Sequence, residues 1–199
     1  HRPRRVVGVE ALPRIAVVDI ETSGLSDRWN RILQIAVVTV DQGAIQDEWS
    51  SLVKLRWPLQ RLGPRRVHGI DRSSLRSAPP SATVLGTLAE RLDGSVLCAH
   101  NVAFDSAFID RAARKHRIAL PAMPRLCTLR LSRALDPDRA QSHRLADLCS
   151  RYGVVNDRPH DALADARATA AVLPHLLAAH GVTQAADLER FYERSLAAR

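Results

Sequence analysis

The segment Ile15-Ala-Val-Val-Asp-Ile-Glu21 decides the fold, because it joins an apolar strand to a pair of acidic residues. Its apolar run predicts a buried strand over 15–20. Side chains alternate between the two faces of a strand, so Asp19 and Glu21 point to the same side. Two carboxylates at this spacing repel each other unless a cation lies between them. Two solvated acids at a frayed strand end would give the same pattern, so the pair alone leaves both interpretations open.

Two more strands and a long connection follow this segment. A second apolar run, Ile32–Val40, is bounded by Asn30 and Gly43, and residues 46–55 look like a third strand. Together the three strands predict an antiparallel meander. Residues 56–80 contain four prolines and two glycines, which predicts a largely irregular connection. A connection this long in a compact domain more often has a function than merely links two elements.

Beyond residue 80, helical spacing alternates with short apolar runs. The runs predict strands over 95–99 and 125–128. The helical pattern predicts helices over 81–93, 104–117, 143–152, 161–180 and 183–197, with a short one ending at Leu135. We expect Ala107, Phe108 and Ala112 to point inward and Pro174 to kink its helix. This order of elements predicts an α/β fold, a mixed sheet of an antiparallel meander and then parallel strands, flanked by helices.

Length and composition bound the class of protein. A chain of 199 residues with 46% hydrophobic residues predicts a single domain over 14–199, preceded by a flexible basic arm over 1–13. No run approaches the ~18 apolar residues that span a bilayer. Three widely spaced cysteines make no disulfide framework, so we expect a cytoplasmic protein. All but two of the 29 cations are arginine, and the net charge is +8. Arginine pairs well with phosphate, which favours a polyanionic partner, although a GC-rich genome would give the same bias.

Two further clusters combine acidic residues with histidine. The first, His100-Asn-Val-Ala-Phe-Asp105, lies where a buried strand leads into a helix. An acid in the first helical turn also favours the helix dipole, so Asp105 alone has a structural explanation. The second, His160-Asp-Ala-Leu-Ala-Asp165, places Asp161 at a helix N-cap and Asp165 one turn into the helix. On its own, this cluster fits a structural cap with a surface histidine.

The three clusters are more informative together than apart. Oxygen ligands without thiolates suit hard divalent cations such as Mg²⁺. Three carboxylates from two strand ends plus one from a helix would form a two-metal cage. A nearby histidine, with its ordinary pKa of about 6.5, would supply a base. Because two-metal sites serve in-line attack at phosphorus, the combination predicts phosphodiester hydrolysis.

The three segments also carry a family resemblance. DIETSGL at 19–25, HNVAFD at 100–105 and HDALADA at 160–166 resemble, in this order, the exonuclease motifs of the DEDD superfamily. The resemblance is to the DnaQ-like subclass with histidine in the third motif, which includes the proofreading epsilon subunit of bacterial DNA polymerase III. It runs from about residue 14 to 180, with weaker matches at 67–70 and 145–148. It implies a ribonuclease H-like fold and 3′→5′ exonuclease activity.

The resemblance implies a role for each matching residue. The metal-binding acids are Asp19, Glu21, Asp105 and Asp165, and the general base is His160. The loop that holds the terminal nucleotide consists of Thr22, Ser23, Gly24 and Leu25, and His68 lies where the family approaches the scissile end. Two positions depart from the family pattern: Ser23 is frequently threonine there, and Gln34 stands where many relatives have glutamate.

Several other residues have competing interpretations. We expect His100 to be structural, His143 to be a surface or cap residue, and Asp161 to be a cap. The three tryptophans, Trp29, Trp49 and Trp57, could stack on bases or fill a core that is poor in aromatic residues. The arginines Arg61, Arg65 and Arg66 could contact phosphates, although a solvated basic loop fits them equally well.

The expected function is hydrolysis of single-stranded or frayed DNA ends from the 3′ terminus, which releases nucleoside 5′-monophosphates. The resemblance implies two divalent ions, Mg²⁺ or Mn²⁺, as cofactors, with the 3′ end of a nucleic acid as the partner. No membrane is expected to take part. The sequence does not identify a polymerase or repair protein as a partner. Two alternatives stay open: the same chemistry on RNA, and a non-catalytic nucleic-acid-binding module of a larger repair or replication protein.

Overall fold

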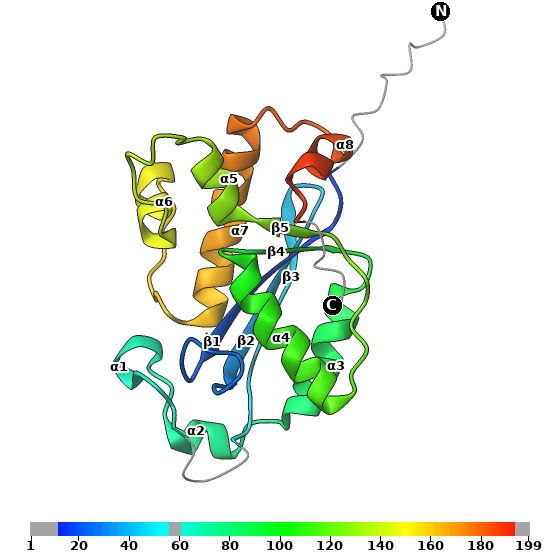
Figure 1. Ribbon diagram of the computed structural model, residues 1–199, viewed down its shortest axis with the longest axis vertical. Helices are drawn as coiled ribbons and strands as arrows, with labels where there is room; N and C mark the ends of the chain where they lie inside the picture. The colour runs from blue at the N-terminus through cyan, green and yellow to red at the C-terminus, as the bar shows by residue number, and fades with distance from the viewer. Residues whose placement is uncertain (1–11, 56–60, 194–199) are drawn as a thin grey trace, which may run out of the picture.

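The computed structural model describes residues 12–55 and 61–193 (Figure 1). Most of the predicted basic arm, over 1–11, lies outside the described residues, as do Trp57 and the last residues of the predicted C-terminal helix. Within the described ranges, no helix is long and apolar enough to cross a membrane.

A five-stranded mixed sheet forms the centre of the molecule, with the strand order β3-β2-β1-β4-β5. The strands are β1 (Ile15–Thr22), β2 (Ile32–Asp41), β3 (Ala44–Leu52), β4 (Val96–Ala99) and β5 (Arg125–Cys127). The first three pair antiparallel, and β4 and β5 run parallel to β1. The predicted meander followed by parallel strands is therefore confirmed.

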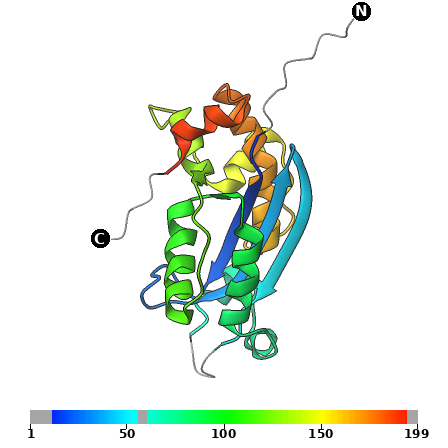
Figure 2. The same ribbon diagram turned by 90° about the vertical axis from the view of Figure 1, so that its right-hand side faces the viewer.

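Helices cover both faces of the sheet (Figures 1 and 2). One face is covered by α3 (Ser81–Leu92) and α4 (Val102–His116). The other is covered by α5 (Thr128–Ala134), α6 (Leu145–Tyr152) and α7 (Ala162–Ala179). Short helices complete the chain: α1 (Arg65–His68), α2 (Arg72–Arg76), α8 (Ala185–Leu188) and a 3₁₀ turn (Glu189–Phe191).

The alternation of side chains along β1 divides the core in two. Ile15 and Val17 pack into the cluster that includes α7. Ala16, Val18 and Ile20 pack into the cluster that includes α3 and α4. Asp19 and Glu21 continue the first series, so the strand directs both carboxylates toward the face that α7 covers. The side chain of Cys98 in β4 is also buried in the core.

Three details differ from the sequence prediction. Residues 65–76 of the irregular connection form two short helices, α1 and α2. In the described part of the predicted helix over 183–197, which ends at residue 193, the chain forms α8 and a 3₁₀ turn instead of one continuous helix. Ala107 is exposed rather than inward. The buried stripe of α4 runs through Asp105, Phe108 and Ile109, and Ala107 lies on the opposite side of the helix.

Pro174 lies inside α7, and the helix continues through it.

Candidate active site

Three elements converge to form a cluster of carboxylates. Asp19 and Glu21 lie at the end of β1, Asp105 in the first turn of α4 and Asp165 in the first turn of α7. Ligand atoms of Glu21, His160 and Asp165 all lie within 4.8 Å of one another. Asp19 interacts electrostatically with Glu21, Asp105 and Asp165. The structure therefore brings together the four acids and the histidine that the sequence singles out, while their roles stay predictions.

Burial and repulsion between carboxylates raise the pKa of Asp19, Glu21 and Asp105. The pKa of Asp19 lies well above its ordinary value because the side chain is desolvated and faces Asp105, Asp165 and Glu21. Burial raises the pKa of Asp105 as well, against the lowering effect of hydrogen bonds from the backbone N–H groups of Asp105 itself and Ile20. Burial, with Asp165 and Asp161 nearby, raises the pKa of Glu21 to about 8.

This electrostatic balance fits a divalent cation. The raised pKa values of Asp19, Glu21 and Asp105 mean that protons or a positive charge stabilise this cluster, because each carboxylate raises the free energy of ionising its neighbours. All four side chains offer oxygen atoms, which are the ligands that Mg²⁺ and Mn²⁺ prefer. The donor set and its repulsion therefore suit a hard divalent cation.

Two hydrogen bonds fix the orientation of Asp165. The backbone N–H of His160 donates to Oδ2 of Asp165 at 2.9 Å, and the side-chain amide of Asn156 donates to Oδ1 at 2.6 Å. His160 has a φ of 66° and is exposed. A backbone in this left-handed region turns the chain sharply just before α7. No local sequence pattern indicates that Asn156 belongs to the site, because its partner Asp165 is nine residues away in a different element.

Gln34 anchors the N-terminus of α7 to the sheet. Its buried side chain accepts a hydrogen bond from the Ala162 N–H at Oε1, at 3.2 Å, and its Nε2 lies 3.5 Å from Oδ2 of Asp161. Gln34 also pairs with Glu21 across β1 and β2. A glutamate here would add a carboxylate beside Glu21 and Asp161, whereas the amide both accepts and donates. Asp161 accepts from the Ala164 N–H at 3.0 Å, so its predicted role as the cap of α7 is confirmed.

The loop after β1 is held firmly while its tip is exposed. Oγ of the buried Ser23 accepts a hydrogen bond from the Arg31 N–H at 3.0 Å. Thr22 donates its hydroxyl hydrogen to the carbonyl of Gly24 at 2.7 Å. Gly24 has a φ of 156°, and a Cβ there would lie 2.6 Å from Nδ2 of Asn30, so only glycine fits. Leu25 follows with 88% of its surface exposed.

His68 is engaged within its own loop. The buried ring donates from Nε2 to the carbonyl of Leu62 at 2.9 Å and accepts at Nδ1 from the Ile70 N–H at 3.0 Å. Both ring nitrogens therefore bind backbone groups of residues 62–70. A contact between His68 and a substrate stays a prediction, and it requires one of these hydrogen bonds to open.

The other two histidines near the motifs have structural surroundings. Nδ1 of His100 lies 3.0 Å from Oγ1 of Thr128, and burial lowers its pKa to about 4, so the ring stays neutral. The prediction that His143 is a surface or cap residue is wrong. Its side chain is only 8% exposed and links Oγ of Ser132, at 2.8 Å, to Oδ2 of Asp136, at 3.1 Å. Ser132 and Asp136 hold the ring inward, a contact that no local pattern encodes.

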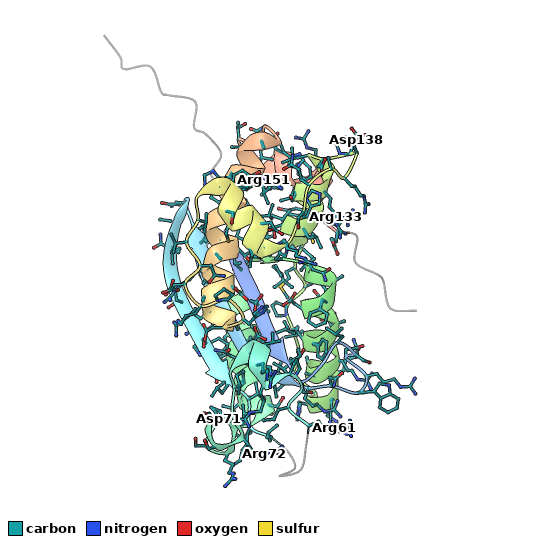
Figure 3. All side chains as sticks on the ribbon, turned by 90° about the vertical axis from the view of Figure 1, so that its left-hand side faces the viewer. Arg61, Asp71, Arg72, Arg133, Asp138 and Arg151 are labelled. Atoms are coloured by element: carbon teal, nitrogen blue, oxygen red, sulfur yellow. The ribbon has the colours of Figure 1, made fainter. Side chains whose placement is uncertain are left out.

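The remaining aromatic and basic candidates have different environments. Trp29 is 73% exposed beside the guanidinium of Arg28, 4.8 Å from its ring centroid. Trp49 packs against the core beneath Arg91. Arg61 lies at the same end of the molecule as Asp71 and Arg72, far from Arg133 and Arg151 (Figure 3). Arg65 and Arg66 are exposed on α1.

Comparison with known proteins identifies the family. The RNase_T family model, described as an exonuclease, matches residues 16–173. The chain therefore belongs to this family of exonuclease enzymes. The family assignment confirms the resemblance to DEDD exonucleases, while the histidine subclass stays a prediction.

Two similar proteins are much longer than this chain. A PolC-type DNA polymerase III of Lacticaseibacillus paracasei is 32% identical over 157 residues, which cover 79% of this chain and 11% of the polymerase. A candidate bifunctional exonuclease/endonuclease protein of Mycobacterium tuberculosis is 42% identical over 113 residues, which cover 56% of this chain and 18% of that protein. The chain thus spans less than a fifth of the length of these two relatives.

Solved structures share the fold. Exonuclease X in complex with 5′ overhanging duplex DNA has a TM-score of 0.63 at 28% identity, covering 87% of this chain and 98% of that one. Exonuclease I of E. coli in complex with a dT13 oligonucleotide has a TM-score of 0.69 at 19% identity, covering 85% of this chain and 42% of that one. These matches confirm the predicted mixed α/β fold.

Proposed function

We propose that this chain is a metal-dependent 3′→5′ exonuclease that acts on single-stranded or frayed DNA ends and releases nucleoside 5′-monophosphates. The observation that carries the proposal is the convergence of Asp19, Glu21, Asp105 and Asp165 from three elements, with His160 beside them. Membership of an exonuclease family and the likeness to exonuclease X, whose structure contains duplex DNA, support it.

The carboxylates would hold two divalent ions, Mg²⁺ or Mn²⁺. Bound there, the ions would make a water molecule more acidic and stabilise charge on the leaving 3′ oxygen. Asp19 interacts electrostatically with the other three acids. It is therefore the best candidate for a ligand that both ions would share. Asn156 and the His160 N–H hold the Asp165 carboxylate in one orientation, so this ligand is positioned before any ion arrives.

His160 would act as the general base. Its side chain is exposed and offers a ring nitrogen within 4.8 Å of ligand atoms of Glu21 and Asp165. A histidine so placed can take the proton from the water that attacks the terminal phosphodiester. His100, neutral and held by Thr128, does not have this access.

The loop of Thr22, Ser23, Gly24 and Leu25 would hold the terminal nucleotide. Ser23 and Gly24 fix the backbone against Arg31 and Asn30, while the exposed Leu25 presents an apolar surface to a base. Holding a free 3′ end beside the carboxylates makes the terminal phosphodiester the bond that is cleaved.

Matched 3′-labelled DNA and RNA oligonucleotides, each with Mg²⁺, Mn²⁺ or EDTA, test this proposal. We expect labelled mononucleotide from DNA with either ion and none with EDTA. Faster release from RNA would instead identify an exoribonuclease. Binding without product under all conditions would identify a non-catalytic nucleic-acid-binding module. Product that persists after complete chelation would contradict the role of metal.

A further inference from the structure

A second site lies away from the carboxylate cluster. A cavity of about 570 Å³ opens between the C-terminal half of α4, the start of α3 and the end of β3. Its apolar lining includes Val53 and Phe108. Its basic lining consists of Arg31, Lys54, Arg111 and Lys115, with one acid, Asp27. The cavity therefore combines an apolar floor with an excess of positive charge.

Three of the basic side chains around this cavity have no acidic partner within the described part of the chain. Among the described residues, Arg31, Lys54 and Arg111 form no ion pair. Arg91, by contrast, pairs with Asp47, and Arg125 pairs with Asp110 at 2.8 Å. Positive side chains gathered around a concave surface focus the electrostatic field and attract anions. Arg31, Lys54 and Arg111 are therefore available to an anionic ligand.

The chain has only two lysines, Lys54 and Lys115, and both line the cavity. A lysine ammonium binds phosphate as a point charge on a flexible stem, whereas arginine binds through a planar fork. The mixture of both around one opening suits phosphates whose positions vary along a strand.

α4 connects the cavity to the carboxylate cluster. Asp105 lies in its first turn, and Phe108, Arg111 and Lys115 follow toward its C-terminus. At 1.5 Å per residue, Arg111 lies about 9 Å and Lys115 about 15 Å beyond Asp105 along the helix axis. A stacked strand advances about 3.4 Å per nucleotide, so a strand that ends at the carboxylates needs about three to five nucleotides to cover this distance.

The loop between β1 and β2 borders both the carboxylate cluster and the cavity. Its first residues, Thr22 to Leu25, lie at the end of β1, while Asp27, Asn30 and Arg31 line the cavity. The hydrogen bond from the Arg31 N–H to Ser23 ties the two parts together. The loop therefore links the surroundings of the carboxylate cluster to the rim of the cavity.

We propose that this cavity binds the nucleic-acid strand about three to five nucleotides from the end held at the carboxylates. Phosphates contact Arg31, Lys54 and Arg111, and one base packs against the floor that contains Val53 and Phe108. The combination of apolar floor and basic rim suits a nucleotide, which offers a flat apolar ring and an anion together. An acidic peptide would use the charge alone. The inference rests on the proposed function, because it takes the carboxylate cluster as the place of the 3′ end.

Equilibrium binding in EDTA tests this site without catalysis. The probes are a fluorescent dT12 and a fluorescent dT3, and the variants are Lys54→Gln and Arg111→Gln. Each variant should raise the Kd for dT12 about threefold to tenfold and leave the Kd for dT3 unchanged. Each should also lower the slope of log K against log salt by about 0.7 for single-stranded DNA. Arg114→Gln is the matched control, since Arg114 is exposed on the same helix outside the cavity lining.

The possible outcomes separate this inference from the proposed function. Equal Kd values and salt slopes for the cavity variants and Arg114→Gln would overturn the inference, even in an active nuclease. A cavity-dependent affinity in a protein without hydrolytic activity would overturn the proposed function and leave strand binding in place. A glutamate dodecapeptide that displaces dT12 as well as unlabelled dT12 does would overturn the assignment to a nucleotide.

Discussion

The backbone N–H of His160 donates a hydrogen bond to Oδ2 of Asp165 at 2.9 Å, so the proposed general base also positions a proposed metal ligand. The two roles use different parts of the residue. The main chain orients the carboxylate, and the imidazole is left to move a proton. Changing the side chain at residue 160 therefore isolates the proton transfer.

His160→Ala should lower turnover by about 10²–10⁴-fold, which is the usual contribution of a positioned base. Mg²⁺ affinity should change little, because the main-chain hydrogen bond to Asp165 persists and the proposed ligands are carboxylates. Single-turnover kinetics and calorimetric titration of Mg²⁺ measure the two effects. His100→Ala is the control, and it should reduce thermal stability more than the rate. The reverse pattern in folded variants would show that the base is misassigned.

Metal-free protein should lose stability as the pH rises. The pKa of Glu21 is raised from 4.5 to about 8 in the folded state, so the folded protein binds more protons than the unfolded chain between these values. The stabilising contribution is fully present below pH 4.5 and is lost as the pH rises through 8. Thermal unfolding in EDTA across this range should show a falling Tm.

Added Mg²⁺ should raise the Tm more at pH 8 than at pH 5, since the ion replaces the lost protons. The variant Glu21→Gln removes one of the acids with a raised pKa and should reduce the pH dependence in EDTA, although Asp19 and Asp105 still contribute to it. A Tm that rises with pH in EDTA would contradict the mutual repulsion of the carboxylates.

Asp19→Asn should abolish turnover while the protein stays folded. Removing one charge from the cluster relieves repulsion on Asp105, Asp165 and Glu21, so the Tm in EDTA at pH 8 should rise by about 2–4 °C. Radiolabelled mononucleotide release and calorimetry measure these effects. Asp110→Asn, outside the cluster on the same α4 helix as Asp105, is the comparison and should retain activity. Cleavage at the wild-type rate by the Asp19 variant would refute its assignment.

Gln34→Leu should destabilise the N-terminus of α7. The substitution removes the acceptor of the Ala162 N–H and should cost about 1–3 kcal/mol in the free energy of unfolding. Chemical denaturation measures this change. Gln46→Leu, at an exposed position on β3, should stay within about 0.5 kcal/mol of wild type. An equal effect of both substitutions would show that Gln34 does not anchor the helix.

A 3′-phosphorylated oligonucleotide or a circular single strand should resist digestion. The proposed loop of Thr22 to Leu25 holds a free 3′ end, which neither substrate offers. Gel analysis against a linear strand of the same sequence measures the difference. Rapid cutting of circles would identify an endonuclease.

Local patterns account for most of the sheet and the acidic cluster. Period-two alternation places Asp19 and Glu21 on one face, and helix-start signals place Asp105 and Asp165 in first turns. The contacts that fix these side chains could not be predicted in this way. Gln34 reaches Ala162 across 128 residues, and Asn156 reaches Asp165 from an irregular loop. Such partners depend on tertiary packing, which periodicity does not describe.

Small or ambiguous side chains explain the other differences. Alanine fits either face of a helix, so Ala107 carried no reliable signal. The inward position of His143 depends on Ser132 and on Asp136 in the following turn. The short helices α1 and α2 lie in a segment whose prolines and glycines favour turns, and Asp71 starts α2 by accepting from the Ser74 N–H at 2.7 Å.

The division of β1 between two packing layers makes the strand intolerant of changes in length. Inserting or deleting one residue between Ile15 and Asp19 would rotate every following side chain by half a turn. The two carboxylates would then enter the layer of α3 and α4, and Ile20 would take their place under α7. Substitutions can separate activity from folding at this strand, but a single-residue shift would remove both at once.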